Sequence, residues 1–508
     1  MHIDSSAPLS DDGKGFRTFS RGEASDYVYP LHTLDGAKYQ HCLLTLFIRF
    51  NDILDPEKIQ RSLKTLLETG DWKKLGGRFR TKHEERISSQ IDGGRWPQLK
   101  TLEIHVPRAF TAERPAVQFA HEEHNSKVTE HSIGHILPQA SNEEVLLSPP
   151  LDGLRQCGLA PGFPTTMDDL VDKDAPQLCF KVISFLDATI LAVTFSHCSW
   201  DISGLQGFMK SLELVLAGRE DEVPSMLGGK TDILSELASQ HHDSSLDPAL
   251  LNMVGGMAQT GQPRAYNSGL EERILRVPLT VFQRLHEYIS IDSPEENEED
   301  LLSYQPDELF LALLVQQIAR SQSAPRPLKL LNIFNARLLV PQIAKSKGIY
   351  SQNLVLLAPQ ILDDELAVGP ILQTVLAQRE CFAQAAVPKN VTRSLYTILG
   401  AIKADIDITG LANSGEEESV LVNNLVRLSS YIDVDLSPAV VRQGDTSPKR
   451  RNGLGTADLC FLTLPGNSYG MMRITTVGSY NGNACWLFGE LPPRAWEQIY
   501  EALAELEI

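Results

Sequence analysis

The strongest constraint on the fold of this chain is a pair of apolar runs joined by a very short connection. Residues 179–185 and 189–195 are rich in aromatic and β-branched side chains, which favours two strands. The three residues between them, Leu186-Asp187-Ala188, favour a hairpin turn. We therefore expect an antiparallel strand pair, followed directly by the polar segment SHCSWD at residues 196–201.

Strands and helices alternate in both halves of the sequence, which predicts the mixed α/β class. Pro56–Glu68 has apolar residues at helical spacing and proline at its start, and Pro306–Ser321 begins with an acidic turn. Further strands are expected at residues 41–50, 328–334, 354–358, 459–464, 473–477 and 484–488, and further helices at 205–216 and 492–506.

The length of 508 residues exceeds what one hydrophobic core supports, so two domains are expected. With 42% apolar and 22% charged residues, the chain has an ordinary globular composition. A polar, acidic stretch that begins at Gly218 separates two halves of similar length. We therefore place a first domain at 1–217, a crossover linker at 218–270 and a second domain at 271–508.

The charge balance restricts the possible partners. Lys and Arg together number 46 and Asp and Glu 65, so the net charge is −19. Such a chain repels phosphate backbones, which argues against nucleic-acid binding. An anionic ligand would need a local basic patch.

Cysteine usage and apolar runs indicate the compartment. The seven cysteines are scattered and form no CxxC motif, which indicates reduced thiols rather than a disulfide framework. The N-terminal segment lacks the apolar core of a signal peptide, and no run approaches the roughly 20 apolar residues of a membrane span. The cytoplasm is the expected location.

The sharpest chemical feature is His197, which directly follows the second strand of the hairpin and lies four residues before Asp201. Functional loops begin at strand ends, and the ordinary histidine pKa near 6.5 suits proton abstraction at neutral pH. Asp201 either orients the imidazole or holds the loop through an ion pair elsewhere. The HxxxD spacing alone is a weak signal, and a hydrogen-bonded structural histidine is the simpler interpretation of it.

Other segments along the chain, in sequence order, make the HxxxD signal more specific. They are LHTLD at 31–35, LGGR at 75–78, the HxxxD motif, the helix at 306–320, NARL at 335–338, YSQN at 350–353, SSY at 429–431 and the closing strand and helix at 485–500. Together they resemble the BAHD acyltransferases, the plant and fungal family that transfers acyl groups from coenzyme A in secondary metabolism. The resemblance covers most of the chain.

This resemblance implies a fold and a reaction. The fold would be two similar mixed-sheet domains of the chloramphenicol acetyltransferase kind, with an interface channel that crosses the molecule beside His197. The reaction would be O-acyl transfer, most simply O-acetyl transfer, from acyl-CoA to a hydroxyl group of a terpenoid, polyketide or alkaloid. The family is usually monomeric and needs no metal, no permanently bound cofactor and no acyl-enzyme.

The resemblance also assigns roles to residues. His197 would act as general base, Asp201 would support the motif loop, and Arg337 and Asn353 would brace the site. Ser429, with Tyr431 beside it, would contact the oxyanion or the substrate. The candidates for coenzyme A binding are Lys449, Arg450, Arg451, Gly453 and Gly455, and a solvated basic loop is the equally simple interpretation of this run.

The sequence departs from the family pattern at three places. Gln352 replaces the glycine of the family's YxGN turn. Ile202 follows Asp201 where glycine is usual, and the DFGWG motif is not intact. The aspartate of that motif is thought to pair with the NxR arginine, so Arg337 is expected to find another partner, with Asp433 and Asp435 as candidates.

Four other functions compete with this interpretation. A serine hydrolase is suggested by GNSYG at 466–470, but no histidine follows it and a strand is expected next. A condensation-domain relative would use a carrier-bound donor, although Ser196 replaces the usual first histidine of its motif. The histidine cluster at 121–135 lacks HExxH, which argues against a metal site. A repurposed scaffold that binds without transfer would not need both His197 and Asp201.

Overall fold

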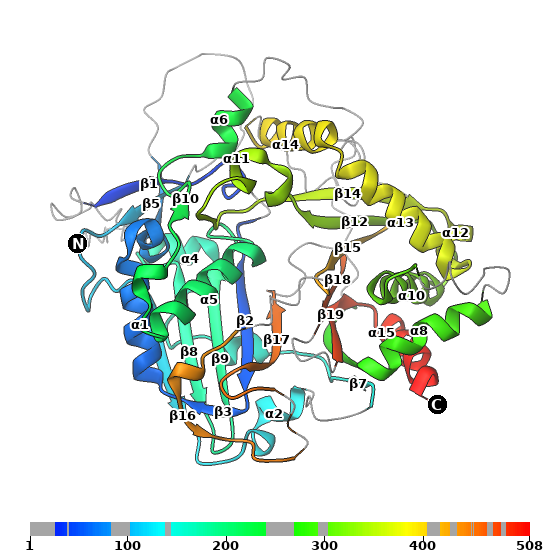
Figure 1. The fold of residues 1–508 in the computed structure, drawn as a ribbon, viewed down its shortest axis with the longest axis horizontal. Helices are drawn as coiled ribbons and strands as arrows, with labels where there is room; N and C mark the ends of the chain where they lie inside the picture. Colours follow the sequence, from blue (N-terminus) through cyan, green and yellow to red (C-terminus); the bar gives the residue numbers. More distant parts are fainter. Residues whose placement is uncertain are drawn as a thin grey trace, which may run out of the picture.

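The structure is a computed structural model of the 508-residue chain. It describes residues 26–37, 40–82, 102–137, 144–239, 269–292, 303–403, 417–426, 434–448, 450, 452–464, 471–478 and 484–507. The mixed α/β class predicted from the sequence is confirmed, and the described strands form several sheets (Figure 1).

The sheet that carries the predicted hairpin has the order β17-β2-β9-β8-β6 among the described strands. Its strands are β17 (Ala457–Thr463), β2 (Leu43–Phe50), β9 (Thr189–Ser196), β8 (Leu178–Ser184) and β6 (Gln118–Glu123). β8 and β9 pair antiparallel as expected, and β9 also pairs antiparallel with β2, with Ser196 opposite Leu43. The chain therefore leaves β9 beside the start of β2.

Helices α1 (Pro56–Glu68) and α5 (Ile202–Leu216) pack together against this sheet. The start of α1 is defined by Pro56 at its first turn and by Asp55, whose side chain accepts from the Lys58 N–H. Its apolar stripe of Ile59, Leu63, Leu66 and Leu67 is buried, and each such side chain contributes about 1.5–3 kcal/mol.

The second large sheet has the order β14-β12-β15-β18-β19-β11-β7 among the described strands. Its strands are β14 (Val355–Leu362), β12 (Leu328–Asn335), β15 (Glu418–Asn424), β18 (Met472–Gly478), β19 (Ala484–Leu491), β11 (Glu271–Pro278) and β7 (Leu146–Leu147). The helices that cover it are α8 (Leu279–Asp292), α10 (Pro306–Ser321), α13 (Ile371–Ala385) and α15 (Pro493–Ala504). Nearly all of α10 is buried, because α8, α13 and α15 contact it from different sides.

The remaining elements are short or peripheral. They are β1 (Tyr27–Pro30), β5 (Leu102–Val106) and β4 (Arg78–Thr81) in one small sheet, β3 (Asp52–Leu54) with β16 (Val440–Gln443), β10 (Met226–Leu227) with β13 (Ile349–Tyr350), and α2 (Ser132–Ile136), α3 (Leu154–Cys157), α4 (Met167–Asp172), α6 (Ile233–Ser239), α11 (Pro341–Ala344), α12 (Asp364–Val368) and α14 (Pro388–Lys403). The 3₁₀ turns used below are η3 (Gly70–Gly76) and η6 (Arg337–Leu339). Of the helices in the described part of the chain, none has both the length and the apolar run needed to cross a membrane.

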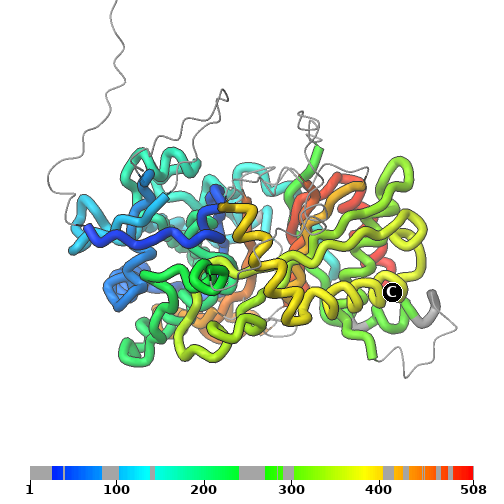
Figure 2. The backbone as a smooth tube through the Cα atoms, turned by 90° about the horizontal axis from the view of Figure 1, so that it is seen from above, coloured from blue at the N-terminus to red at the C-terminus, as the bar shows by residue number. Residues whose placement is uncertain are grey.

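The two lobes lie side by side, and strands cross between them (Figures 1 and 2). β16 and β17, from the second half of the chain, pair with β3 and β2 of the first lobe, and β7, from the first half, pairs with β11 of the second. β2 is buried along its whole length, so its outer backbone groups need the partner that β17 supplies. The predicted division at residues 217 and 271 is therefore crossed in both directions.

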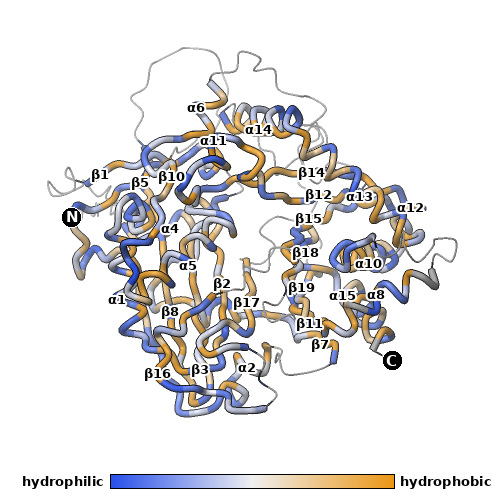
Figure 3. Tube along the Cα trace, viewed as in Figure 1, coloured by the Kyte–Doolittle hydropathy of each residue, from blue (hydrophilic) through white to orange (hydrophobic). Residues whose placement is uncertain are grey.

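The hydropathy of the chain follows this architecture. Figure 3 shows hydrophobic residues along the strands of both lobes, whereas helix surfaces such as that of α14 carry hydrophilic residues. One core cluster joins β2, β8 and β9 to Val477 and Trp486 of β18 and β19. Apolar packing thus continues from the first lobe into the second.

Candidate active site

His197 is held at the end of β9 by backbone contacts on both sides. Its N–H donates to the Cys42 carbonyl at 2.9 Å, which continues the β2–β9 pairing by one residue. Its carbonyl accepts from Asn353 Nδ2 at 2.9 Å, a contact from the opposite half of the chain. The position of the imidazole is therefore set by a sheet edge and by a residue of the second lobe.

The imidazole of His197 presents one nitrogen to a pocket. Nδ1 is buried and has no hydrogen-bond partner among the described residues, whereas the side chain as a whole is partly exposed and lines the pocket. Nε2 is thus the accessible nitrogen. Burial lowers the pKa of His197 below its ordinary value, and the nearby charge of Asp201 opposes this only in part. The ring is therefore neutral at neutral pH and able to accept a proton.

Asp201 makes four hydrogen bonds, and none of them reaches this imidazole. Oδ1 accepts from the Gly204 N–H, which caps the start of α5, and Oδ2 accepts from the Leu354 N–H, both at 2.9 Å. Arg337 donates to both oxygens, at 2.7 and 3.0 Å. Four bonds occupy the four acceptor positions of the carboxylate, so none remains for His197. Of the two arrangements considered from the sequence, the structure shows the ion pair.

Arg337 uses all of its five N–H donors. Besides Asp201, they reach the Asn335 side chain at 3.2 Å and the carbonyls of Tyr350 and Gln352 at 2.9 and 2.6 Å. This corrects the partner expected from the sequence. Asp435 instead accepts from the Ser437 N–H at 2.8 Å, and residue 433 lies outside the described residues.

The same region contains a second link across the interface. Asn353 donates from its backbone N–H and from Nδ2 to Oδ1 of Asp35, both at 2.8 Å, and accepts from Gln40 at 3.3 Å. Asp35 lies in the LHTLD segment, which had been matched to the family without a role. Asn353 therefore joins the N-terminal segment, at Asp35 and Gln40, to the backbone of His197.

A pocket of about 560 Å³ opens beside His197. That is within the range of small-molecule sites in proteins. Its walls are mainly apolar, and the apolar contributors include Ile202, Leu311, Ile333, Phe334, Leu338, Val355, Val375, Phe382 and Leu425. Leu338 stands out because 83% of it is exposed although it directly follows the fixed Arg337. Such a side chain is available to pack against a substrate.

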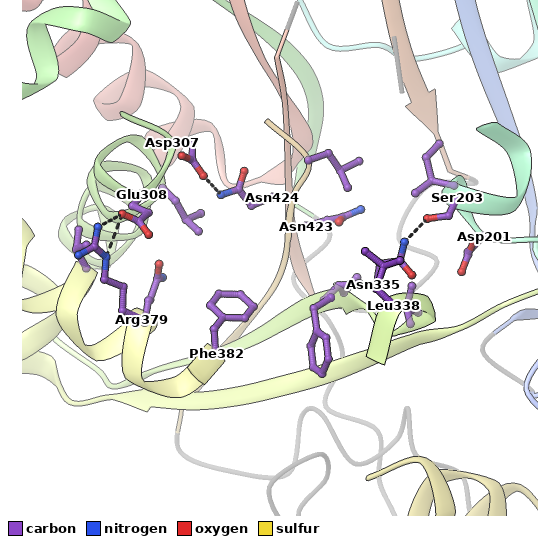
Figure 4. A pocket seen from close by; sticks show the side chains of 18 of the residues that line it. Asp201, Ser203, Asp307, Glu308, Asn335, Leu338, Arg379, Phe382, Asn423 and Asn424 are labelled. Atoms are coloured by element: carbon purple, nitrogen blue, oxygen red, sulfur yellow. Dashed lines mark hydrogen bonds and ion pairs between the residues drawn. The ribbon is translucent and has the colours of Figure 1, made fainter. Parts of the chain in front are cut away.

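The polar groups of the pocket are grouped in pairs, as Figure 4 shows. Asn424 donates to Asp307 at 3.1 Å, Arg379 donates to Glu308, and Asn335 donates to Ser203 at 3.0 Å. The sequence did not predict these residues, or Asn423 of β15, as part of the site. Helix starts and strand ends were the available signal, since Asp307 lies in the first turn of α10 and Asn424 ends β15.

The predicted coenzyme A segment can be placed only in part. Lys449, Arg451, Ser429 and Tyr431 lie outside the described residues. Arg450 is described, and its donors are all engaged. It binds both oxygens of buried Asp52, at 2.6 and 2.7 Å, and backbone carbonyls of its own loop and of the segment before β3. No donor is left for a phosphate.

The two glycines of this segment, Gly453 and Gly455, make backbone contacts within the fold. The Gly453 carbonyl accepts from Arg450 at 2.9 Å. Gly455 has a φ of +69°, and a Cβ at that position would lie 2.3 Å from the Ser437 Cα. Its N–H donates to Asp52 at 2.7 Å. Only glycine fits this close approach.

The competing motifs give no second site in the described part of the chain. GNSYG at 466–470 lies outside it. His121 bonds to Ser184 at 2.9 Å, and His124 pairs with Glu122 at 2.8 Å. Within the described ranges, no group of three or more His, Cys, Asp or Glu side chains is arranged to hold a metal ion. Trp200 is buried between Phe195 and Phe208, as a core residue.

Comparisons with known proteins find acetyltransferases and O-acyltransferases among the relatives. No protein-family model matches the chain. The O-acetyltransferase PaAT-2 of Phomopsis amygdali is 25% identical over an alignment of 507 residues that covers 95% of this chain and 98% of the relative. The O-acyltransferase ausP of Aspergillus calidoustus is 28% identical over 408 residues, or 79% and 80% of the two chains.

A solved structure supports the fold. F. graminearum TRI101, complexed with coenzyme A and deoxynivalenol, matches with a TM-score of 0.63 at 12% identity. The match covers 93% of this chain and 96% of that one. The likeness therefore extends over both lobes.

Proposed function

We propose that this chain is a BAHD-type acyltransferase, similar to fungal O-acetyltransferases and O-acyltransferases, and that it transfers an acetyl group from acetyl-CoA to a hydroxyl group of a secondary metabolite. The acceptor class is a terpenoid, polyketide or alkaloid alcohol. The observation that carries the proposal is the position of His197, whose neutral imidazole lines a pocket of about 560 Å³ while its Nδ1 is buried, which leaves Nε2 to act as the base.

The general base makes the alcohol nucleophilic only while it attacks. Nε2 of His197 takes the hydroxyl proton as the oxygen bonds to the thioester carbonyl carbon, so no free alkoxide forms. The tetrahedral intermediate then collapses, the carbon–sulfur bond breaks, and the coenzyme A thiolate takes the proton from the imidazolium. The ester and free coenzyme A leave, and His197 returns to its neutral form.

The oxyanion of the intermediate needs a fixed hydrogen-bond donor. Ser429 remains the donor proposed from the sequence. Asn423 is a second candidate, because it lies on β15 and lines the same pocket as His197. Its side-chain amide is labelled in Figure 4, within the pocket.

The phosphates of coenzyme A need cations other than Arg450, because the donors of Arg450 are engaged by Asp52 and by carbonyls. Lys449 and Arg451, on either side of it, remain the proposed ligands. We also propose that the protein acts as a monomer in the cytoplasm.

The test uses acetyl-CoA, which does not require knowing the acceptor. We expect calorimetric binding of acetyl-CoA in the micromolar range, and release of free coenzyme A thiol when a panel of terpenoid, polyketide and alkaloid alcohols is added. Failure to bind acetyl-CoA or longer acyl-CoA donors would contradict the proposal and favour a carrier-bound donor.

A further inference from the structure

The buried carboxylate of Asp35 is linked to the backbone of His197 through the side chain of Asn353. Asp35 is 1% exposed, and its Oδ1 accepts two N–H groups of Asn353 at 2.8 Å each. The second N–H of Asn353 Nδ2 donates to the His197 carbonyl. Both hydrogens of one amide nitrogen are therefore used, one toward Asp35 and one toward the catalytic loop. The Asp35 carboxylate therefore holds the Asn353 amide in place, and the amide holds the loop that begins at His197.

Lys74, from η3, is a second buried charged residue, and it acts electrostatically on Asp35. Lys74 is 3% exposed, and its ammonium has no hydrogen-bond partner among the described residues; neither has Oδ2 of Asp35. Burial raises the pKa of Asp35 to about 7, and the charge of Lys74 is the largest opposing influence. Burial lowers the pKa of Lys74 to about 8, and Asp35 is again the largest opposing influence.

The other titratable groups near Asp35 and Lys74 are neutral or already hydrogen-bonded, so each of these two charges is compensated mainly by the other. His32, also buried, has a strongly lowered pKa because of burial and of Lys74, so it is neutral. Asp232 and Asp71 also act on Lys74, but Asp232 is already bonded to Thr33, and Asp71 to Tyr29. An isolated buried charge is costly to maintain, so removing one member leaves the other without compensation.

We propose that buried Asp35 positions His197 through Asn353, with buried Lys74 as its opposite charge. The proposal rests on the proposed function, because it assumes that His197 does the chemistry. Asp35 and Lys74 are positioning residues, since they contact neither substrate nor cofactor. Hydrogen bonds to a charged acceptor are stronger than those to a neutral one, so the pair stiffens the link to the loop at 197–201.

The experiment compares Asp35→Asn, Lys74→Met and the double variant with the wild-type chain. The first readout is hydrogen exchange in the peptide that contains residues 197–201. The second is thiol release from acetyl-CoA with an acceptor alcohol from the screen, which separates kcat from KM. Asp458→Asn is the matched control, because it neutralises a buried ion pair with Arg49 at the far end of β2.

We expect each single variant to exchange faster in this peptide and to lose about 10- to 100-fold in kcat, since small displacements of catalytic groups have effects of this size. KM for acetyl-CoA should not change. The double variant should be no worse than the poorer single variant, because it leaves no unpaired charge. Asp458→Asn should lower the melting temperature without changing kcat or exchange at 197–201.

Two results would overturn the inference. One is wild-type exchange and kcat in Asp35→Asn, and the other is single-variant losses that multiply in the double variant. If Asp35→Asn does not fold, Lys74→Met carries the same test alone. Hydrogen exchange requires no turnover, so absence of acyl transfer in the wild-type chain would refute the proposed function and leave this inference to be judged separately.

Discussion

Replacing Asp201 by Asn should destabilise the protein far more than its near-identical shape suggests. Whichever way the new amide is oriented, its NH₂ group meets two donors. These are either the Arg337 and Leu354 N–H groups at Oδ2 or the Arg337 and Gly204 N–H groups at Oδ1. The buried guanidinium, 12% exposed, also loses its counterion. Breaking a buried pair in this way costs about 3–5 kcal/mol.

That cost is large against a typical unfolding free energy of about 5–15 kcal/mol. It should lower the melting temperature by about 3–5 °C, because a chain of 508 residues has an unfolding entropy of about 1 kcal/mol/K, and calorimetry or circular dichroism measures the shift. Since Asp201 ends the loop that begins at His197, we also expect a loss of about 100-fold in turnover at 25 °C. Replacing Arg337 by Met in the Asp201→Asn background should add less than Arg337→Met costs alone, by about 0.5–3 kcal/mol.

Asp201 therefore acts mainly through the architecture of the loop. An Asp201→Asn variant that keeps the wild-type melting temperature would refute this assignment, because the four hydrogen bonds of the carboxylate would then not stabilise the loop.

Three further predictions concern the base and the 450–455 loop. The pKa of His197 lies below its ordinary value of about 6.5, and only the neutral ring accepts a proton. We therefore expect kcat/KM to stay level from neutral pH downward and to fall only below about pH 6.5. A midpoint of the acid limb above that value would contradict the geometry. Gly455→Ala should lower the free energy of unfolding by at least about 1–2 kcal/mol, because of its positive φ and the close Ser437 backbone, and an unchanged denaturant midpoint would count against this. Arg450→Met, which strips fully buried Asp52 of its partner, should cost about 3–5 kcal/mol in stability but leave calorimetric acetyl-CoA affinity unchanged; a selective loss of affinity would restore Arg450 as a phosphate ligand.

Local signals in the sequence predicted the individual elements well. The bounds of α1 and α10 agree with the expected Pro56–Glu68 and Pro306–Ser321, because each helix begins with proline at its first turn and continues an apolar pattern. The β8–β9 hairpin was also predicted, because its short turn leaves little choice of pairing. These features depend on neighbours in the sequence.

Features that depend on distant residues could not be predicted in the same way. Pairing of β17 with β2 joins residues about 400 positions apart, and nothing in the periodicity of either strand identifies the other. The partner of Arg337 was missed for the same reason. The family pattern placed the arginine, but which carboxylate lies within reach is a property of the folded interface.

The site was predictable to a similar extent. The position of His197 after a strand and the place of Asn353 in a turn of the second half were both deduced from motifs, and the structure brings the two together. The role of Asp35 was not foreseen, since a lone aspartate in an N-terminal segment has no signature of burial or of a partner 318 positions away.

The most direct test of the central claim is a comparison of wild type with His197→Ala at saturating acetyl-CoA and an active acceptor alcohol. Removal of a general base should lower kcat by about 10²- to 10⁴-fold, while calorimetric affinity for acetyl-CoA and the melting temperature stay close to wild type. A variant that binds acetyl-CoA and still releases thiol at the wild-type rate would show that His197 is not the base.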